Sequence, residues 1–150
     1  LCVLQNRLNP TIPMGMVHAN IEIINAADLE LADRMQIGEE AIRRVEISCL
    51  VDSGAVMLTI NEDIRETLGL RIKDHRPSQL ADGRRIMLPV AGPVEVRFEG
   101  RFCTTNALVL PDDNEPLLGA IPMEEMDLWI NPNRGMLTPI HPEGPVMSLK

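Results

Sequence analysis

The sequence Leu50-Val51-Asp52-Ser53-Gly54-Ala55 is the most informative stretch of the chain. Its first two residues end a run, residues 44–51, in which apolar and polar residues alternate as they do in a half-buried strand. An aspartate directly after such a strand is unusual, because burial of a carboxylate costs free energy unless the charge is paired. Two interpretations are open: a polar turn in which Gly54 takes a positive φ, or a carboxylate held in place for chemistry. The apolar residues on both sides of the motif favour the second.

Turn and cap signals place further elements downstream of this stretch. After an apolar run over residues 55–60, Asn61 is a suitable N-cap for a short helix, and Gly69 is a suitable stop. The pair Asp82-Gly83 lies between apolar flanks within residues 79–91 and predicts a β-hairpin. A second hairpin is predicted from residues 94–98 and 102–110, which are joined at Glu99-Gly100.

The remaining elements are short. Leu117-Leu118-Gly119 leads into a helix with Pro122 in its first turn, and residues 128–130 and 135–137 flank a turn at residues 131–134. Upstream, residues 17–24 predict a strand, and residues 28–34 predict a helical turn capped by Asp28. We therefore expect one mostly-β domain with one or two short helices over residues 17–138, an N-terminal arm over residues 1–16 and a C-terminal tail over residues 139–150.

Composition excludes several classes of function. The chain has 150 residues, enough for one domain with a core, and 14 Lys and Arg against 22 Asp and Glu give a formal charge of −8. A protein this acidic has no field that attracts phosphate backbones, so we expect no nucleic-acid partner. No apolar run approaches the ~20 residues that cross a bilayer, so we expect no membrane partner.

The cysteines and histidines do not suggest a metal site. Three cysteines at wide spacing do not form a disulfide framework, and His18, His75 and His141 show no ligand spacing relative to them. We expect reduced, mostly buried thiols, no metal and no organic cofactor. The N-terminus lacks a basic stretch followed by an apolar run, so the cytoplasm is the expected location.

The order of these motifs resembles that of the retropepsin-like aspartic proteases, in particular their small bacterial members. That family has two apolar residues before Asp-(Thr/Ser)-Gly-Ala, then a flap hairpin, then two apolar residues and a glycine before a short helix. Here these parts are residues 50–55, the hairpin at Asp82-Gly83, and Leu117-Leu118-Gly119 before Pro122. The resemblance implies a closed, barrel-like β domain and hydrolysis of peptide bonds.

The resemblance also implies roles for individual residues. Asp52 would be catalytic, Ser53 would brace the site through its hydroxyl, and Gly54 would leave space for the substrate main chain. The flap would close over an extended peptide, and apolar side chains would line subsites. The substrate-binding residues implied in this way are Leu50, Ala55, Leu80, Ala81, Asp82, Gly83, Arg84, Ile86 and Leu117.

Catalysis of this kind needs two carboxylates that share one proton, and the chain has one Asp-Ser-Gly motif. Asp82 belongs to a hairpin tip, Asp112 and Asp113 to a turn, and Asp127 to a helix end. We therefore expect a homodimer in which Asp52 meets Asp52 of a second chain across a two-fold axis.

Two departures from the family pattern keep an alternative open. Viral members carry an acidic residue after the alanine and an arginine after the second glycine, where this chain has Val56 and Ala120. The flap carries Asp82, Arg84 and Arg85 in place of several glycines. The alternative is a non-catalytic dimeric β module that binds peptides or a protein partner in the same cleft. A further hypothesis is that the enzyme cleaves its own N-terminal arm.

Overall fold

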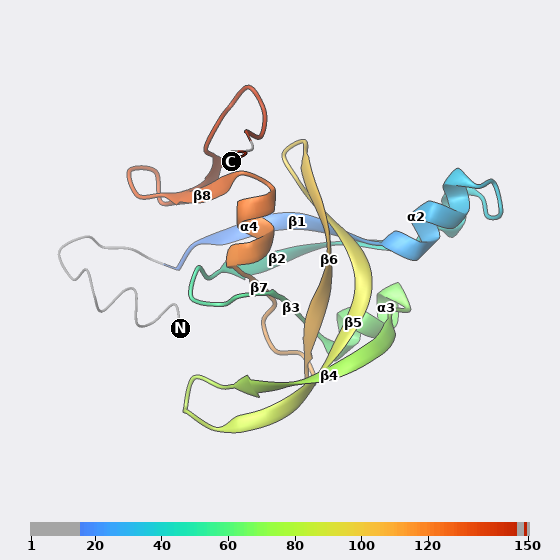
Figure 1. Cartoon of the computed structure of the whole chain (residues 1–150), viewed down its shortest axis with the longest axis horizontal. Helices are drawn as coiled ribbons and strands as arrows, with labels where there is room; N and C mark the ends of the chain where they lie inside the picture. The colour runs from blue at the N-terminus through green and yellow to red at the C-terminus, as the bar shows by residue number, and fades with distance from the viewer. Residues whose placement is uncertain (1–15, 147–148, 150) are drawn as a thin grey trace.

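Seven of the described strands form a sheet that closes on itself. In the computed structural model, which describes residues 16–146 and 149, the main sheet has the order β1-β2-β7-β3-β6-β5-β4, and β1 also pairs with β5. This extra pairing closes a ring of strands from which β4 projects (Figure 1). The predicted mostly-β, barrel-like fold is confirmed. The strands are β1 His18–Asn25, β2 Arg44–Val51, β3 Leu58–Asn61, β4 Arg71–Gln79, β5 Arg85–Phe98, β6 Arg101–Leu110, β7 Leu117–Leu118, β8 Leu128–Asn131 and β9 Met136–Pro139.

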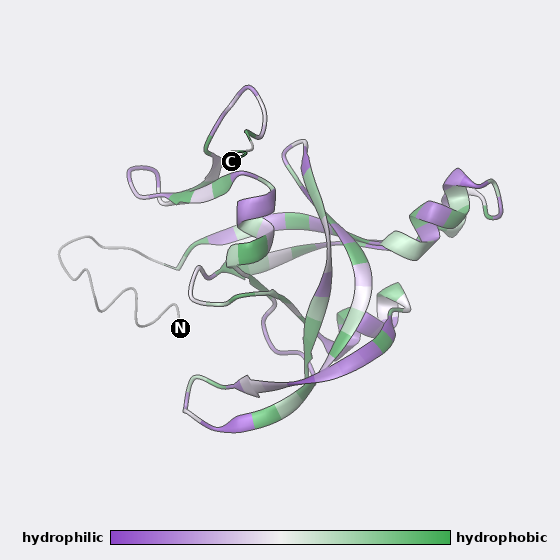
Figure 2. Ribbon diagram, viewed as in Figure 1, coloured by the Kyte–Doolittle hydropathy of each residue, from purple (hydrophilic) through white to green (hydrophobic). Residues whose placement is uncertain are grey.

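Aliphatic side chains fill the interior of the ring. Residues alternate between buried and exposed along β1 and β5, as expected for strands with one face on a core. The alternation appears in Figure 2 as changes of hydropathy along each strand. A fully buried aliphatic side chain contributes about 1.5–3 kcal/mol to the free energy of folding through its removal from water. The core therefore stabilises the ring and fixes the points at which other segments leave it. The core includes Ile21, Ile23, Leu58, Ile60, Val94, Val96 and Leu118.

The two long hairpins were predicted from their turns. Leu80 N donates to Arg84 O at 2.8 Å and closes the turn between β4 and β5, while Glu99 and Gly100, both with positive φ, connect β5 to β6. The register of β5 shifts between Ala91 and Val94. Before this shift β5 pairs with β4, and after it with β1. The first half of β5 and β4 therefore form an arm that extends from the ring.

Three helices decorate the described part of the ring: α2 Ala26–Asp33, α3 Glu62–Leu68 and α4 Ala120–Glu125, with a 3-10 turn, η1, at Glu39–Ala41. Helix α3 has the predicted caps, because Asn61 accepts a hydrogen bond from Ile64 N and Gly69 adopts the left-handed conformation at φ 63°. The cap predicted for the helix near residue 28 is wrong. Asn25 caps α2, and Asp28 is instead a buried residue of its first turn.

Asp28 is buried because it binds an arginine from outside the helix. Its carboxylate accepts bonds from Arg43 Nε at 2.9 Å, Arg43 Nη2 at 3.0 Å and Arg43 N at 3.0 Å. The hydrogen bonds from the Arg43 side chain lower the pKa of Asp28, against the opposing effect of burial. This pair fastens α2 to the segment that enters β2.

The Asp28–Arg43 pair should make stability depend on pH. We expect Asp28→Asn to lower the free energy of unfolding by about 1–2 kcal/mol near neutral pH, since Arg43 is half exposed and partly screened. The folded pKa lies below the ordinary 3.8, so the stabilisation is present above that value and is lost as the pH falls through the folded pKa. Urea unfolding at neutral and strongly acid pH measures the difference between wild type and variant, which should shrink in acid. The exposed Asp33, changed to Asn in the same helix, is the control.

The C-terminal part returns to the ring. After α4, strands β8 and β9 pair as an antiparallel hairpin around the predicted turn at residues 131–134. The expected N-terminal arm lies outside the described residues except for Met16, and the expected domain boundaries at residues 16 and 138 stay predictions. In the part of the chain that the structure describes, no helix is long and apolar enough to span a bilayer.

Candidate active site

Strand β2 places Asp52 at the edge of the ring. Its last residues pair in parallel with β7, so that Leu50 lies opposite Leu117 and Val51 opposite Leu118. The backbone N–H of Asp52 continues this ladder by donating to Leu118 O at 3.0 Å. Asp52 is only 2% exposed. The aspartate is therefore fixed by the sheet rather than carried on a loose turn.

The segment after Asp52 folds back on the aspartate. Gly54 N donates to Asp52 Oδ1 at 2.9 Å, and Ala55 N donates to Asp52 O at 3.0 Å. Both bonds are features of a tight turn, as the polar-turn interpretation anticipates. Ser53 and Gly54 are exposed at its tip, whereas Ala55 is buried. The turn holds the carboxylate by one oxygen, and Gly54 remains exposed beside it.

The same segment, residues 52–57, crosses the start of α4, and we call it the aspartate loop. Ala120 N donates to Ala55 O at 2.8 Å, and Ile121 N donates to Val56 O at 3.0 Å. The first N–H groups of a helix lack partners within the helix, so the loop carbonyls serve as their acceptors. A Cβ on Gly119 would lie 2.4 Å from Met57 O. The glycine of the Leu-Leu-Gly motif is thus required by the close approach of two backbones.

Asp52 differs from the other buried aspartates. Asp28, Asp52 and Asp127 are the buried carboxylates among the described residues. Asp28 pairs with Arg43 and Asp127 with Arg101, but none of the ion pairs formed by described residues involves Asp52. A buried carboxylate without a cation is costly in a core. This arrangement favours a role in chemistry over one in packing.

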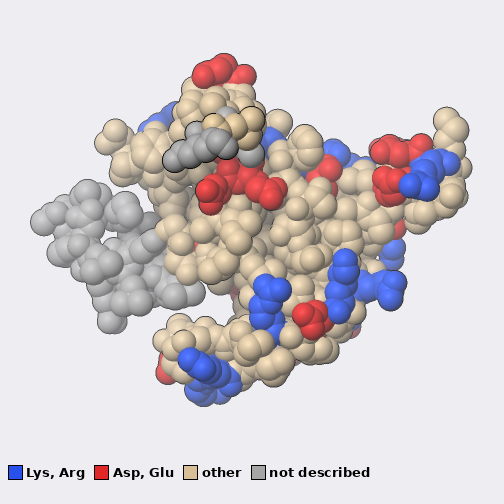
Figure 3. Space-filling model, in the orientation of Figure 1, with Lys and Arg blue, Asp and Glu red and all other residues tan. Residues whose placement is uncertain are grey.

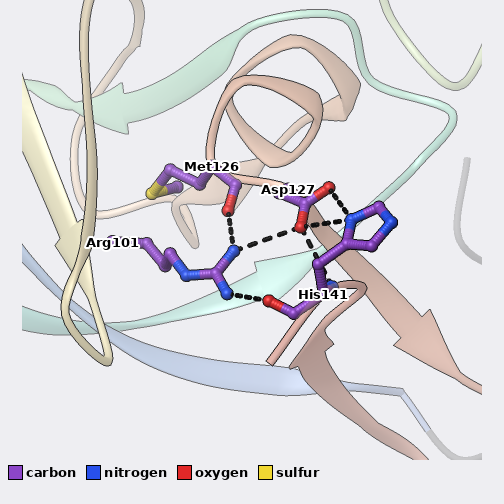
Figure 4. A network of polar contacts seen from close by, with 4 residues as sticks. All are labelled: Arg101, Met126, Asp127 and His141. Atoms are coloured by element: carbon purple, nitrogen blue, oxygen red, sulfur yellow. Dashed lines mark hydrogen bonds and ion pairs between the residues drawn. The ribbon is translucent and has the colours of Figure 1, made fainter. Parts of the chain in front are cut away.

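Asp127 has a structural environment (Figure 4). It accepts from Arg101 Nη1 at 3.3 Å and from His141 N at 3.0 Å, and His141 Nδ1 lies 2.9 Å from its Oδ2. Arg101 also donates to Met126 O and His141 O, so the network joins β6, the end of α4 and the segment after β9. Burial acts to raise the pKa of Asp127, but the hydrogen bonds of His141 and Arg101 outweigh it and lower the pKa. Nothing local in the sequence indicates this network.

The structure brings together part of the predicted site. Leu50, Ala55 and Leu117 lie beside Asp52, with the first two buried and Leu117 half-buried. Ile86 is half-buried at the start of β5, on the hairpin arm rather than in the ring. The tip of that arm is mostly exposed, and Arg84 Nε donates there to Asp82 Oδ2 at 2.7 Å. The predicted tip residues Leu80, Ala81, Asp82, Gly83 and Arg84 all lie in this turn.

The sequence-based prediction missed one contact between the arm and the aspartate loop. Arg76 Nη1, from β4, lies 3.2 Å from Met57 Sδ, where the thioether accepts a hydrogen bond. Met57 is the last residue of the loop, next to β3. The side chain of Arg76 thus reaches from the hairpin arm to the loop that carries Asp52.

Other parts of the molecule offer little chemistry. A cavity of about 510 Å³ is lined by α2, by the residues that follow α3, by the start of β4 and by Pro93 of β5. Asp52 does not line it. No cluster of potential metal ligands occurs within residues 16–146. Cys49 and Cys103 are free and buried, as predicted, and burial raises the pKa of each thiol to about 12, so both stay protonated. Cys2 lies outside the described residues.

Comparison with known proteins agrees with this geometry. A family model described as aspartyl protease matches residues 33–121, which include both Asp52 and Gly119. No curated protein matches the chain. EIAV protease complexed with the inhibitor HBY-793 has a similar structure, with TM-score 0.54, 16% identity and coverage of 75% of this chain and 88% of that chain. The retroviral protease-like domain of Ddi1 from Leishmania major is also similar, with TM-score 0.52, 17% identity and coverage of 83% and 88%. The fold is thus that of the retropepsin-like proteases, and the chain belongs to the aspartyl protease family.

Proposed function

We propose that the protein is a homodimeric aspartic endopeptidase in which Asp52 and Asp52 of the partner subunit activate a water molecule. The observation that carries this proposal is the burial of Asp52 without a cation, at a position fixed by β7 and by the loop over α4. The family membership supports the same chemistry. Two such carboxylates close together share one proton, because both cannot ionise at that distance.

The shared proton divides the work between the two carboxylates. The ionised one takes a proton from water, whose oxygen attacks the peptide carbonyl carbon, while the protonated one donates to the carbonyl oxygen. Collapse of the tetrahedral intermediate breaks the C–N bond, the leaving amine takes the proton that the first carboxylate gained from water, and a hydroxyl of the intermediate returns a proton to the second carboxylate. Gly54 gives the substrate main chain room and a carbonyl acceptor, Ser53 braces the two loops, and the hairpin arm covers the peptide. Leu50, Ala55, Ile86 and Leu117 line apolar subsites.

The environments of the other aspartates support the proposed dimer. Asp28 and Asp127 are bound to arginines, Asp82 is bound to Arg84 at a hairpin tip, and Asp112 and Asp113 are exposed. None of these comes directly after the last residue of a strand, as Asp52 does after β2. A two-fold axis that uses the same patch on both subunits supplies the second carboxylate.

Cleavage of an unstructured protein tests the proposal. Purified protein incubated with such a substrate, with and without a pepstatin-like inhibitor, should give products that the inhibitor prevents. The mass in solution should be that of a dimer. Tight peptide binding without products would instead identify the non-catalytic binding module, and a strictly monomeric protein would contradict the shared dyad.

The activity should depend on pH through the shared proton. We expect kcat/KM to be highest below neutral pH and to fall as the pH rises, because the dyad loses its acid when both carboxylates ionise. A pH series with one peptide substrate, corrected for unfolding in acid, measures this. A rate that stays constant into strongly alkaline solution would rule out the two-carboxylate mechanism.

A further inference from the structure

The hairpin arm carries charge opposite to that of the rest of the molecule. Residues 71–85 contain five Lys or Arg and two Asp, whereas the rest of the chain has nine Lys or Arg and twenty Asp or Glu. Every residue of β4 except Ser78 is exposed, and the strand is largely hydrophilic in Figure 2. Figure 3 shows Lys and Arg gathered over the lower half of the molecule, where the arm lies, and most Asp and Glu above. The arm is therefore a cationic element on an acidic protein.

One cation of this arm lies at the aspartate loop. Arg76 is held against Met57 by the bond from Nη1 to Sδ at 3.2 Å. The backbone of Met57 packs on Gly119, so this contact ties Arg76 to the segment that positions Asp52. Residues i and i+2 of a strand share a face, and the half-buried Ser78 lies on the same face as Arg76. From that face of β4, Arg76 reaches the loop.

Arg76 keeps most of its binding capacity. A guanidinium has five N–H donors, and a thioether is a weak acceptor that uses one of them. Among the described residues no carboxylate forms an ion pair with Arg76, whereas Arg84 at the tip is occupied by Asp82. The loop itself carries no charged residue other than Asp52. The positive charge beside the loop is therefore available to a ligand.

We infer that Arg76 is a specificity-determining residue that binds an acidic side chain of the substrate near the scissile bond. This inference rests on the proposed function and adds the substrate class: extended peptides with Asp or Glu close to the cleavage site. A carboxylate can accept two parallel bonds from a guanidinium, which gives geometric selection as well as attraction. Since charges more than about 8–10 Å apart are screened at physiological salt, the local cation outweighs the distant negative charge of the protein.

Matched peptides test the inference. Sites cleaved in an unstructured protein are first mapped, and one cleaved peptide is then made in three forms with Glu, Gln or Lys at each position around the scissile bond. At one position we expect the wild type to prefer Glu by roughly tenfold in kcat/KM, a preference that weakens as salt is added. Arg76→Gln should reduce this ratio to about one, and Arg76→Glu should reverse the preference in favour of Lys.

Arg71→Gln is the matched control, because Arg71 is an exposed cation at the far end of the same strand and lines the separate cavity. It should keep the ratio of the wild type. Cleavage by the wild type with no preference for Glu at any position, or a preference that survives in Arg76→Gln, would overturn this inference while leaving the endopeptidase in place. Failure of the wild type to cleave any peptide would overturn both proposals.

Discussion

Asp52→Asn is expected to reduce kcat/KM at least roughly a thousandfold, because the amide can neither take a proton from water nor share one with its partner. The same change should leave the fold intact. The amide oxygen can still accept from Gly54 N, and the side chain keeps its size. The free energy of unfolding should therefore stay within about 0.5 kcal/mol of that of the wild type near neutral pH. Peptide cleavage and urea unfolding of the same preparation measure both effects.

The combination of lost activity and retained stability distinguishes Asp52 from a structural aspartate. Asp28→Asn should lower stability because that carboxylate is bound to Arg43. Asp113→Asn, in an exposed turn, should change neither quantity. Full activity of the Asp52 variant would exclude the carboxylate mechanism, and a large loss of stability would assign Asp52 a role in packing.

Mixing subunits extends the test to the dimer. When a fixed amount of wild-type chain exchanges subunits with increasing amounts of the Asp52→Asn chain, its activity should fall toward zero. Each mixed dimer has lost one of its two carboxylates, whereas a chain that carried a complete site would keep its activity during the titration.

Gly119→Ala is expected to have the largest effect on stability, a loss of about 3 kcal/mol or more. Its backbone is extended, with φ −91° and ψ −176°, so the conformation itself suits alanine. The cost comes from space. The new Cβ would lie 2.4 Å from Met57 O and 2.8 Å from Ala55 O, and backbone atoms in a hydrogen-bonded loop cannot move aside cheaply. Relief of the overlap must shift the aspartate loop, so cleavage should fall together with stability.

Gly38→Ala is the control for this substitution. A Cβ there would also meet atoms at short range, the nearest being Glu40 Oε1 at 2.3 Å. These atoms end a flexible, exposed side chain that can rotate away, so the stability should change by less than about 0.5 kcal/mol. Equal effects at both glycines in urea unfolding would show that the crossing of loop and helix is not tightly packed.

Local signals account for the parts of the fold that were predicted from sequence. Helix α3 was predicted because Asn61 and Gly69 each cap the end of the helix next to them. The hairpins were predicted because Asp82-Gly83 and Glu99-Gly100 lie in the turns that they favour. The α2 cap was assigned to the wrong residue. A local rule favours Asp28 as a cap, but its bonds to Arg43, which lies beyond the helix, place it inside the first turn.

In the candidate site, too, local features were predicted from the sequence and contacts between distant residues were not. Asp52 was found because a carboxylate after an apolar strand is visible in the sequence itself. The contact of Arg76 with Met57, and the network of Arg101, Asp127 and His141, join residues that are distant along the chain. Only the tertiary fold brings these residues together, and side-chain periodicity contains no information about such pairings.

The parallel pairing of β2 with β7 also determines when the aspartate loop can form. The acceptor for Asp52 N is Leu118 O, and the donors for the loop carbonyls are Ala120 N and Ile121 N. Leu118, Ala120 and Ile121 follow Asp52 in the sequence by more than half of the length of the described domain. Contacts between residues this distant in sequence form slowly and late. A growing polypeptide on the ribosome therefore exposes Asp52 before it can order the loop around it, and the candidate site is complete only after the Leu-Leu-Gly segment has been synthesised and docked.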